Sequence, residues 1–375
     1  MSSNQSIQEL NNRFKEFFLL EGFDYIEPPL VVNSDIYFET SGEQIRKDMF
    51  SVSSAQGTEM CLRPDLTIPT CQTFIKKNQN FDQAKLCYSG PIFRSGDVNN
   101  SIELNQSGIE ILSTNMIKDD NYQEEVDIIN LAIKTLNNIN KVNFDINLGN
   151  ISIFIEFLNC LDLPQRWKDR LKRHFFRRDY FESLLKRIEL GIGFNEIRKE
   201  DVLKKHLGIK VDISDSDLKE RLMNINAIEF GERSIEDIIN RLNVKSETII
   251  SSEKGVEIVR VIRSFLNINC ELEQLPNLIT DFAKKENKHQ FDNVIQMASN
   301  FSKKIKLGIG NTAINFKTDF GHSIEYYDGI MFEIEDRDNQ SNKLLVGGRY
   351  DGLLNNLGLD SRASAIGFAV NNNNI

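Results

Sequence analysis

Cysteine and histidine are scarce in this chain, and neither residue type is grouped. Its five cysteines are scattered and form no C-x-x-C pair: Cys61, Cys71, Cys87, Cys160 and Cys270. The four histidines also lie far apart. A disulfide framework needs paired cysteines in an oxidising compartment, and a local zinc motif needs cysteine or histidine ligands at short spacing. We therefore expect small core thiols in a reducing compartment, with no metal and no cofactor.

An excess of basic charge and long apolar runs are also missing. The formal net charge is −10, whereas a dedicated nucleic-acid binder usually carries a basic surface. No apolar run approaches the length of a membrane span. The start, MSSNQSIQELNNRFKEFF, lacks the basic region, apolar core and cleavage site of a signal peptide. These absences argue against nucleic-acid and membrane partners and predict a cytoplasmic protein.

The spacing of apolar residues predicts how the chain is organised. A helix is expected over 7–20, and short strand-like runs between 48 and 112 indicate a largely antiparallel sheet. Helical periodicity dominates from about 151 to 300, and strand-like runs return from KIKLGIG (304–310) onward. Further helices are predicted over 67–78, 122–138, 215–224, 234–242, 253–267 and 290–304. The pattern is that of a sheet domain, split by a helical insertion.

Polar side chains share one face of the predicted strand ELNQSGIEIL. Alternation places Gln106, Gly108 and Glu110 on the same side. Glycine leaves room there, and two polar side chains beside it suit the floor of a ligand site. An exposed sheet face would carry the same residues, and alternation alone favours that interpretation.

Two more motifs carry residues that could bind a ligand. In CLRPDLTIP, Asp65 and Thr67 could receive an ammonium group, but capping of the helix that starts near Ile68 is the better local interpretation. In GPIFRSGD, Arg94 ends a strand and could clamp a carboxylate or phosphate. Its position alone favours an ordinary surface arginine.

Glycines and basic residues give weaker signals. Gly347-Gly348 permits close backbone approach, but a structural turn is an equally good interpretation. Neither G-x-G-x-x-G nor G-x-x-x-x-G-K occurs, so a phosphate-cradling loop is not supported. A basic stripe could contact RNA or an acidic partner, although such stripes are usually solvated helix faces. Its members are Arg166, Lys168, Arg170, Lys172, Arg173, Arg177 and Arg178.

In their order, these motifs resemble a known family. YIEPPLVVNSDIYFETSGE, CLRPDLT, GPIFR with ELNQSGIE, IEYYDGIMFE, VGGRYDGLL and AIGFA follow the layout of the histidyl-tRNA synthetase catalytic domain. The segment LGNISIFIEFLNCLDLPQRWKDRLKRHFFRRDYF is similar to the regulatory subunit of ATP phosphoribosyltransferase, a paralogue of the synthetase.

The resemblance implies an α+β fold of the class II aminoacyl-tRNA synthetase type, an antiparallel sheet flanked by helices. Residues 1–150 and 305–375 would form its two halves, and 151–304 would form a mainly helical insertion. An anticodon-binding domain would be absent, because the chain ends where that domain would begin.

Departures from the synthetase pattern concern positive charge. Arg94 aligns with the first phosphate-binding arginine, but the loop after it, SGDVNNSIELNQ, has no lysine or arginine. His322 stands where the synthetase has an arginine that polarises the substrate carboxylate, and Asn374 stands at the arginine of the last motif. Each lost charge-assisted contact is worth roughly 1.5–3 kcal/mol. The resemblance therefore implies a chain that no longer adenylates efficiently.

The amino-acid pocket matches the family better. By resemblance, Asp65 and Thr67 would receive the α-amino group of histidine, with help from Gln106. Glu110 and Tyr327 would address the two imidazole nitrogens, one a donor and one an acceptor in the neutral ring. Alternation points the first tyrosine of the pair to the other strand face, where packing is its expected role unless a bulge at Asp328-Gly329 rotates it. The predicted histidine-binding residues are Asp65, Thr67, Arg94, Gln106, Glu110, Tyr326 and Tyr327.

The predicted function is that of a non-catalytic regulatory subunit. It would be required by the short-form ATP phosphoribosyltransferase catalytic subunit, at the first step of histidine biosynthesis, and would bind histidine for feedback inhibition. Self-association into a dimer or larger assembly is expected through the region around Pro28-Pro29. The main alternative is a truncated synthetase-like enzyme that activates an amino acid with ATP. A second alternative is a tRNA-binding module that uses the basic stripe.

Overall fold

The computed structural model describes most of the chain, in two compact units. The described residues are 2–40, 43–53, 57–78, 81–95, 102–114, 122–192, 250–286, 289–310, 312–321, 326–339, 342–360 and 362–375. The first unit combines Met1–Phe157 with Phe265–Ile375, and the second is Leu158–Ser264. The predicted helices at 215–224 and 234–242 lie outside the described residues. The predicted domain boundaries at 150 and 304 stay a prediction.

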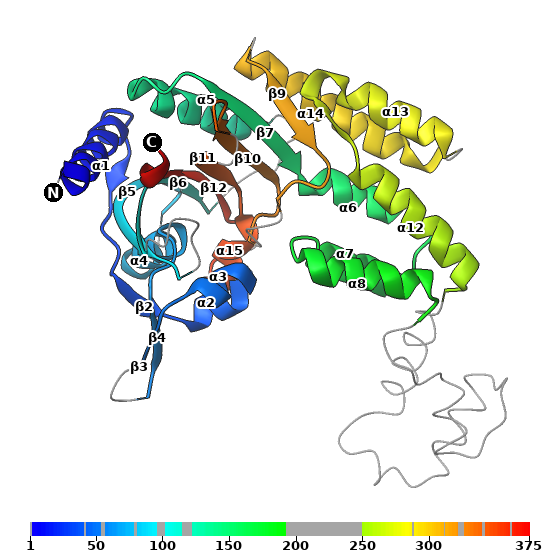
Figure 1. Cartoon of the computed structure of the whole chain (residues 1–375), viewed down its shortest axis with the longest axis horizontal. Helices are drawn as coiled ribbons and strands as arrows, with labels where there is room; N and C mark the ends of the chain where they lie inside the picture. Colours follow the sequence, from blue (N-terminus) through cyan, green and yellow to red (C-terminus); the bar gives the residue numbers. More distant parts are fainter. Residues whose placement is uncertain are drawn as a thin grey trace, which may run out of the picture. The chain divides into compact units, whose positions relative to one another are not determined.

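A nine-stranded, mostly antiparallel sheet forms the centre of the first unit (Figure 1). Its strand order is β1 (Asp24–Tyr25), β5 (Gln83–Phe93), β6 (Glu103–Ser113), β12 (Ser364–Asn371), β11 (Lys343–Arg349), β10 (Ile330–Asp336), β7 (Phe144–Asn150), β9 (Ile314–Lys317) and β8 (Asn269–Glu271). Only β1–β5 and β7–β9 pair in parallel among these strands. Strands from both ends of the chain thus lie side by side, which confirms the predicted α+β fold.

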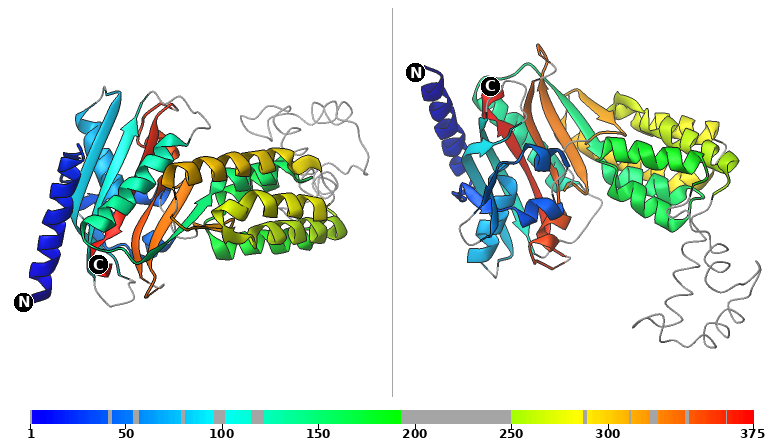
Figure 2. Two further views of the ribbon diagram at one scale, coloured as in Figure 1. Left: turned by 90° about the horizontal axis from the view of Figure 1, so that it is seen from above. Right: turned by 60° about the horizontal axis from the view of Figure 1, so that its bottom comes forward.

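Two long helices cover one face of this sheet (Figure 2). The helix α1 (Ser2–Leu20) lies against β5 and β6, and α5 (Gln123–Asn138) lies against β11 and β12. The ring of Phe18 in α1 packs on Phe368 in β12, with 6.0 Å between the ring centroids. This face of the sheet is therefore the one that packs against the two long helices.

The predicted strand at 304–310 is wrong, because α14 (Asp292–Ile309) continues through it. Phe301, Ile305 and Ile309 are buried, whereas Leu307 is 79% exposed. A strand would have placed Leu307 on the same face as its neighbours two residues away. In a helix, residues four apart share a face, which explains why Phe301, Ile305 and Ile309 are buried together. The apolar alternation in KIKLGIG concealed this spacing in the sequence. The helix α13 (Leu275–Lys285) packs beside α14.

The other face of the sheet meets shorter elements. The start of α4 (Thr67–Lys77) covers it, because Leu66 clusters with Tyr88, Ile92 and Leu104. The helix α15 (Asp351–Asn356) follows β11 and contacts β12. A separate three-stranded sheet has the order β2 (Val31–Asn33), β4 (Glu59–Leu62), β3 (Ser51–Ser53), and its neighbours in sequence are α2 (Asp35–Thr40) and α3 (Glu43–Asp48). These elements frame the sheet face described below.

The second unit is helical where it is described. It contains the end of α6 (Ile151–Cys160), then α7 (Gln165–Arg173), α8 (Arg178–Glu189) and most of α12 (Ser252–Leu266). The helices α8 and α12 approach closely, since a Cβ on Gly255 would lie 2.0 Å from the carbonyl oxygen of Ile188. Pro164 begins α7, as its sequence position predicts. Among the helices in the described ranges, none combines the length and apolarity that a membrane crossing needs.

Candidate functional site

Glycines line the open face of the large sheet in successive strands. Glu110 in β6 pairs with Gly367 in β12, which pairs with Gly348 in β11. A Cβ on Gly367 would lie 1.9 Å from Oε2 of Glu110, and one on Gly348 would lie 2.8 Å from the ring of Tyr327. Both positions therefore require glycine, so that a carboxylate and an aromatic ring can lie flat on the sheet.

Glu110 is the centre of a buried hydrogen-bond cluster. Its side chain has no exposed surface. The hydroxyl of Tyr88 donates to Oε1 at 2.9 Å, and the hydroxyl of Tyr350 donates to Oε2. Gly108 makes room for Tyr88, because a Cβ there would lie 2.6 Å from that hydroxyl. Burial raises the pKa of Glu110 to about 7, against the opposing effect of its hydrogen bonds.

Two further tyrosines, Tyr326 and Tyr327, pack beside Tyr350. The ring centroids of Tyr326 and Tyr327 lie 5.0 Å apart, and that of Tyr350 lies 5.6 Å from the first and 6.2 Å from the second. The prediction that Tyr326 faces the other side of a strand is wrong. The strand β10 begins only at Ile330, so alternation does not apply to the turn before it, and both tyrosines join the same cluster.

The two carboxylate oxygens of Asp65 differ in their hydrogen bonding. Its Oδ1 accepts a hydrogen bond from the backbone N–H of Ile68 at 2.9 Å, which confirms the capping interpretation. Its Oδ2 is buried, and no partner for it lies within the described ranges. Burial raises the pKa of Asp65 to about 6, although nearby Arg94 opposes this shift. Thr67 lies close by, with its hydroxyl 3.3 Å from that of Tyr88.

Arg94 and Gln106 flank this region. The Nε of Arg94 donates to the carbonyl oxygen of Pro64 at 2.7 Å, which fixes the guanidinium near Asp65. Gln106 lies on the open sheet face two residues from Gly108, and its Oε1 is buried without a partner in the described part of the chain. The structure thus brings Thr67, Glu110 and the tyrosine pair into contact through Tyr88 and Tyr350. Asp65, Arg94 and Gln106 lie around that cluster.

Two residues of the cluster were missed by sequence reasoning. Tyr88 shares the sheet face of Gly108, which it pairs with across β5 and β6, and Tyr350 follows the Gly347-Gly348 pair. For Tyr88 the signal was the glycine opposite it on the next strand, which becomes visible only when the strand register is known. His322 lies outside the described residues.

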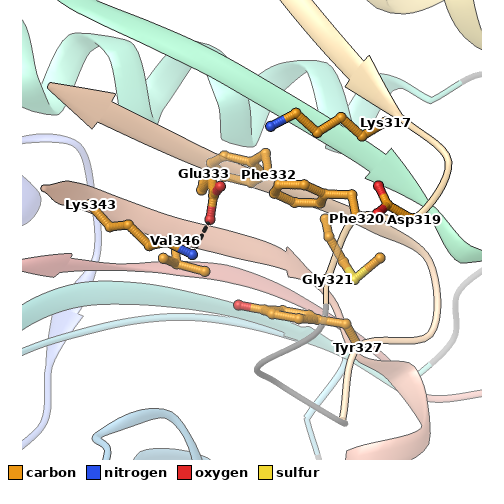
Figure 3. Close-up of a pocket in the computed structure, with 10 residues that line it drawn as sticks. Lys317, Asp319, Phe320, Gly321, Tyr327, Phe332, Glu333, Lys343 and Val346 are labelled. Carbon is orange, nitrogen blue, oxygen red and sulfur yellow. Dashed lines mark ion pairs between the residues drawn. The ribbon is translucent and has the colours of Figure 1, made fainter. Parts of the chain in front are cut away.

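A cavity of about 260 Å³ adjoins Tyr327 on the same sheet face (Figure 3). Met331 and Val346 contribute to its apolar wall, and Lys343 forms an ion pair with Glu333 at 2.8 Å. Small-molecule pockets usually measure about 300–1,000 Å³, so this cavity suits a ligand of amino-acid size. Figure 3 shows the ring of Tyr327 forming one wall. The polar cluster and the cavity therefore meet at this tyrosine.

No metal site was found in the part of the chain that the structure describes. There, no three histidine, cysteine or acidic side chains come together as metal ligands. All five cysteines are free thiols. The open face carries buried carboxylates, an amide oxygen and tyrosine hydroxyls, which suit recognition of a small polar ligand.

The basic stripe lies on α7 and α8 of the second unit. Arg170 donates to the hydroxyl of Tyr180 at 3.4 Å, and Lys168 donates to the carbonyl oxygen of Asn159 at 2.8 Å. Lys172 and Arg173 are exposed. The role of the stripe stays a prediction.

The raised pKa values predict how stability depends on pH. A buried carboxyl whose folded pKa is raised contributes stability that is present below its ordinary pKa and is lost as the pH rises through the folded value. For Asp65 and Glu110 this loss falls between about pH 4 and pH 7. In wild type, the free energy of unfolding should fall by on the order of 2–3 kcal/mol more between pH 5 and 7.5 than it does in Glu110→Gln. Urea unfolding of both proteins from pH 5 to 7.5 measures it, and parallel curves would contradict it.

Known proteins resemble this chain in sequence. A family model described as histidyl-tRNA synthetase matches residues 2–191 and 200–375. The ATP phosphoribosyltransferase regulatory subunit of Brucella ovis is 27% identical over 354 residues, which cover 92% of this chain and 91% of that protein. The protein of the same name from Brucella abortus is also 27% identical, with 92% and 90% covered.

Solved structures show the same fold. An ATP phosphoribosyltransferase regulatory subunit/histidyl-tRNA synthetase from Bacillus halodurans has a TM-score of 0.62 at 16% identity, covering 100% of this chain and 79% of that one. A histidyl-tRNA synthetase from Nostoc sp. PCC 7120 has a TM-score of 0.58 at 14% identity, covering 99% and 70%. The sheet is therefore of the class II synthetase type. The chain belongs to the histidyl-tRNA synthetase family, in which its sequence relatives include regulatory subunits of ATP phosphoribosyltransferase.

Proposed function

We propose that this protein is the non-catalytic regulatory subunit of a short-form ATP phosphoribosyltransferase, and that it senses histidine. It would act in the cytoplasm at the first step of histidine biosynthesis. Relatives that carry the name of this subunit match 92% of the chain. The observation that supports binding of histidine is a pair of buried acceptor oxygens, Asp65 Oδ2 and Gln106 Oε1. The described residues supply no donor for either oxygen.

A histidine molecule has groups that suit the cluster. Its ammonium group supplies the donors that Asp65 Oδ2 and Gln106 Oε1 lack, and leaving such buried acceptors unpaired costs about 1–3 kcal/mol each. Its carboxylate would meet Arg94. Its imidazole would lie between Glu110 and Tyr327, one an acceptor and the other a hydroxyl. An apolar side chain in that place would leave the same groups unpaired, which is the physical basis of specificity.

The absence of catalysis is supported by the C-terminal motif. The asparagines that follow β12 form the short helix η4 (Asn372–Asn374). Asn374 stands where the resemblance places an arginine, and its Nδ2 donates to the carbonyl oxygen of Lys343 at 2.8 Å. A neutral amide that is bonded to the backbone cannot neutralise a phosphate, which adenylation requires.

The partner is tested by reconstitution. We expect the purified protein to co-elute with a short-form catalytic subunit, to raise its phosphoribosyltransferase activity, and to make that activity sensitive to histidine. Histidine binding is measured separately by calorimetry. A protein that neither associates with the catalytic subunit nor changes its activity would rule out the regulatory role.

The enzyme alternative has its own test. Robust ATP–pyrophosphate exchange with histidine would show that the chain still activates an amino acid and would overturn the non-catalytic proposal. We expect no exchange above that of a sample without protein.

A further inference from the structure

Arg349 lies between two residues that form the candidate site. Gly348 before it lies under the ring of Tyr327, and Tyr350 after it donates to Glu110. Because side chains alternate along a strand, Arg349 at the end of β11 points to the opposite, helix-covered face. Its side chain is only 8% exposed. Arg349 thus lies on the face of β11 opposite to the candidate site.

The guanidinium of Arg349 is fully engaged on that face. Its Nε donates to Glu125 at 2.7 Å, and one terminal nitrogen donates to Glu124 at 2.7 Å, both in the first turn of α5. Its other terminal nitrogen donates to Asp351 at 3.3 Å. Burial alone would lower the pKa of Arg349, but Glu125 and Asp351 raise it above the ordinary value. The forked arrangement needs the planar geometry of arginine, which lysine cannot reproduce.

The same residue holds the turn that carries the tyrosine pair. The backbone N–H of Asp328 donates to the carbonyl oxygen of Arg349 at 3.0 Å. The carboxylate of Asp328 then accepts from the N–H groups of Asp351 at 3.1 Å and Gly352 at 2.6 Å. A Cβ on Gly329 would lie 3.0 Å from Cβ of Arg349, so the turn rests directly on this side chain.

From these contacts we infer that Arg349 is a positioning residue, which fixes Tyr327 and Tyr350 over Glu110 by anchoring their backbone segments to α5. The inference rests on the proposed function, because the positioned rings are those proposed to bind histidine. Arg349 itself touches no ligand. It acts through the two segments whose tyrosines project onto the open face.

The test compares Arg349→Lys and Glu125→Gln with Arg337→Lys as a matched control. Arg337 also forms an ion pair, with Asp145 at 2.8 Å, but at the far end of β10. Each full-length variant is labelled with 3-fluorotyrosine, and its fluorine NMR spectrum and histidine affinity are measured. Tyr327→Phe and Tyr350→Phe assign the two resonances. We expect Arg349→Lys and Glu125→Gln to shift both resonances and to weaken histidine binding at least fivefold, and Arg337→Lys to do neither.

The outcomes separate this inference from the proposed function. Unchanged resonances and wild-type affinity in Arg349→Lys and Glu125→Gln, even with a lowered melting temperature, would show that Arg349 only stabilises the fold and would overturn the inference. If the wild-type protein binds no histidine, the proposed function fails, and the fluorine resonances alone decide whether Arg349 positions the tyrosines.

Discussion

Glu110→Gln should weaken histidine binding by at least 30-fold. The substitution keeps the shape of the side chain but removes the negative charge from the centre of the cluster. A hydrogen bond to a buried charged group contributes about 2 kcal/mol, which corresponds to this factor. Glutamine must also direct an N–H₂ group toward one of the two tyrosine hydroxyls that now donate to the carboxylate. Isothermal titration with histidine at pH 7.5 measures the change.

Glu335→Gln is the matched control for this result. Glu335 is another carboxylate of the same sheet, and it accepts from Asn147 at 2.8 Å, but it belongs to neither the cluster nor the cavity wall. We expect wild-type affinity from this variant. Equal affinities of Glu110→Gln and wild type would remove Glu110 from the proposed imidazole contact, and equal losses in both variants would indicate a general effect of charge.

Much of the sheet could be predicted from sequence because its strands have local signals. The run ELNQSGIEIL alternates, is bounded by polar residues, and became β6 at Glu103–Ser113. KIKLGIG alternates equally well but is helical, because Ile305 and Ile309 also fit the four-residue spacing that begins at Phe301. Seven residues carry too little information to separate the two periods.

The site was predictable only in part, because its geometry depends on contacts between distant strands. The resemblance to the family named Asp65, Thr67 and Glu110, and the structure places them around one cluster. The resemblance could not show that one oxygen of Asp65 caps α4, while the other has no hydrogen-bond partner among the described residues. Nor could alternation place Tyr326, because the strand begins after it. Such details arise from tertiary packing, which sequence periodicity does not encode.

Gly367→Ala should strongly weaken histidine binding and destabilise the protein. The added Cβ would lie 1.9 Å from Oε2 of Glu110 and 2.3 Å from the carbonyl oxygen of Ile109. Neither atom can yield easily, because the carboxylate is held by two tyrosine hydroxyls and the carbonyl belongs to the backbone of β6. Overpacking of this kind costs about 1–3 kcal/mol, and thermal melting should show a lower midpoint. Calorimetry should show a loss of affinity of about 100-fold or more, because Glu110 must leave its position.

Gly90→Ala provides the contrast on the same sheet face. A Cβ there would meet a terminal nitrogen of Arg63 at 3.0 Å, whereas the Cβ on Gly367 would meet the carboxylate of Glu110 at 1.9 Å. The two variants add the same methyl group. A difference in their melting temperature or histidine affinity therefore reflects the atoms next to each glycine, and not the loss of glycine itself. If Gly367→Ala has the melting temperature and the histidine affinity of the wild type, the carboxylate of Glu110 does not pack against Gly367. The proposed histidine site would then lose its structural basis.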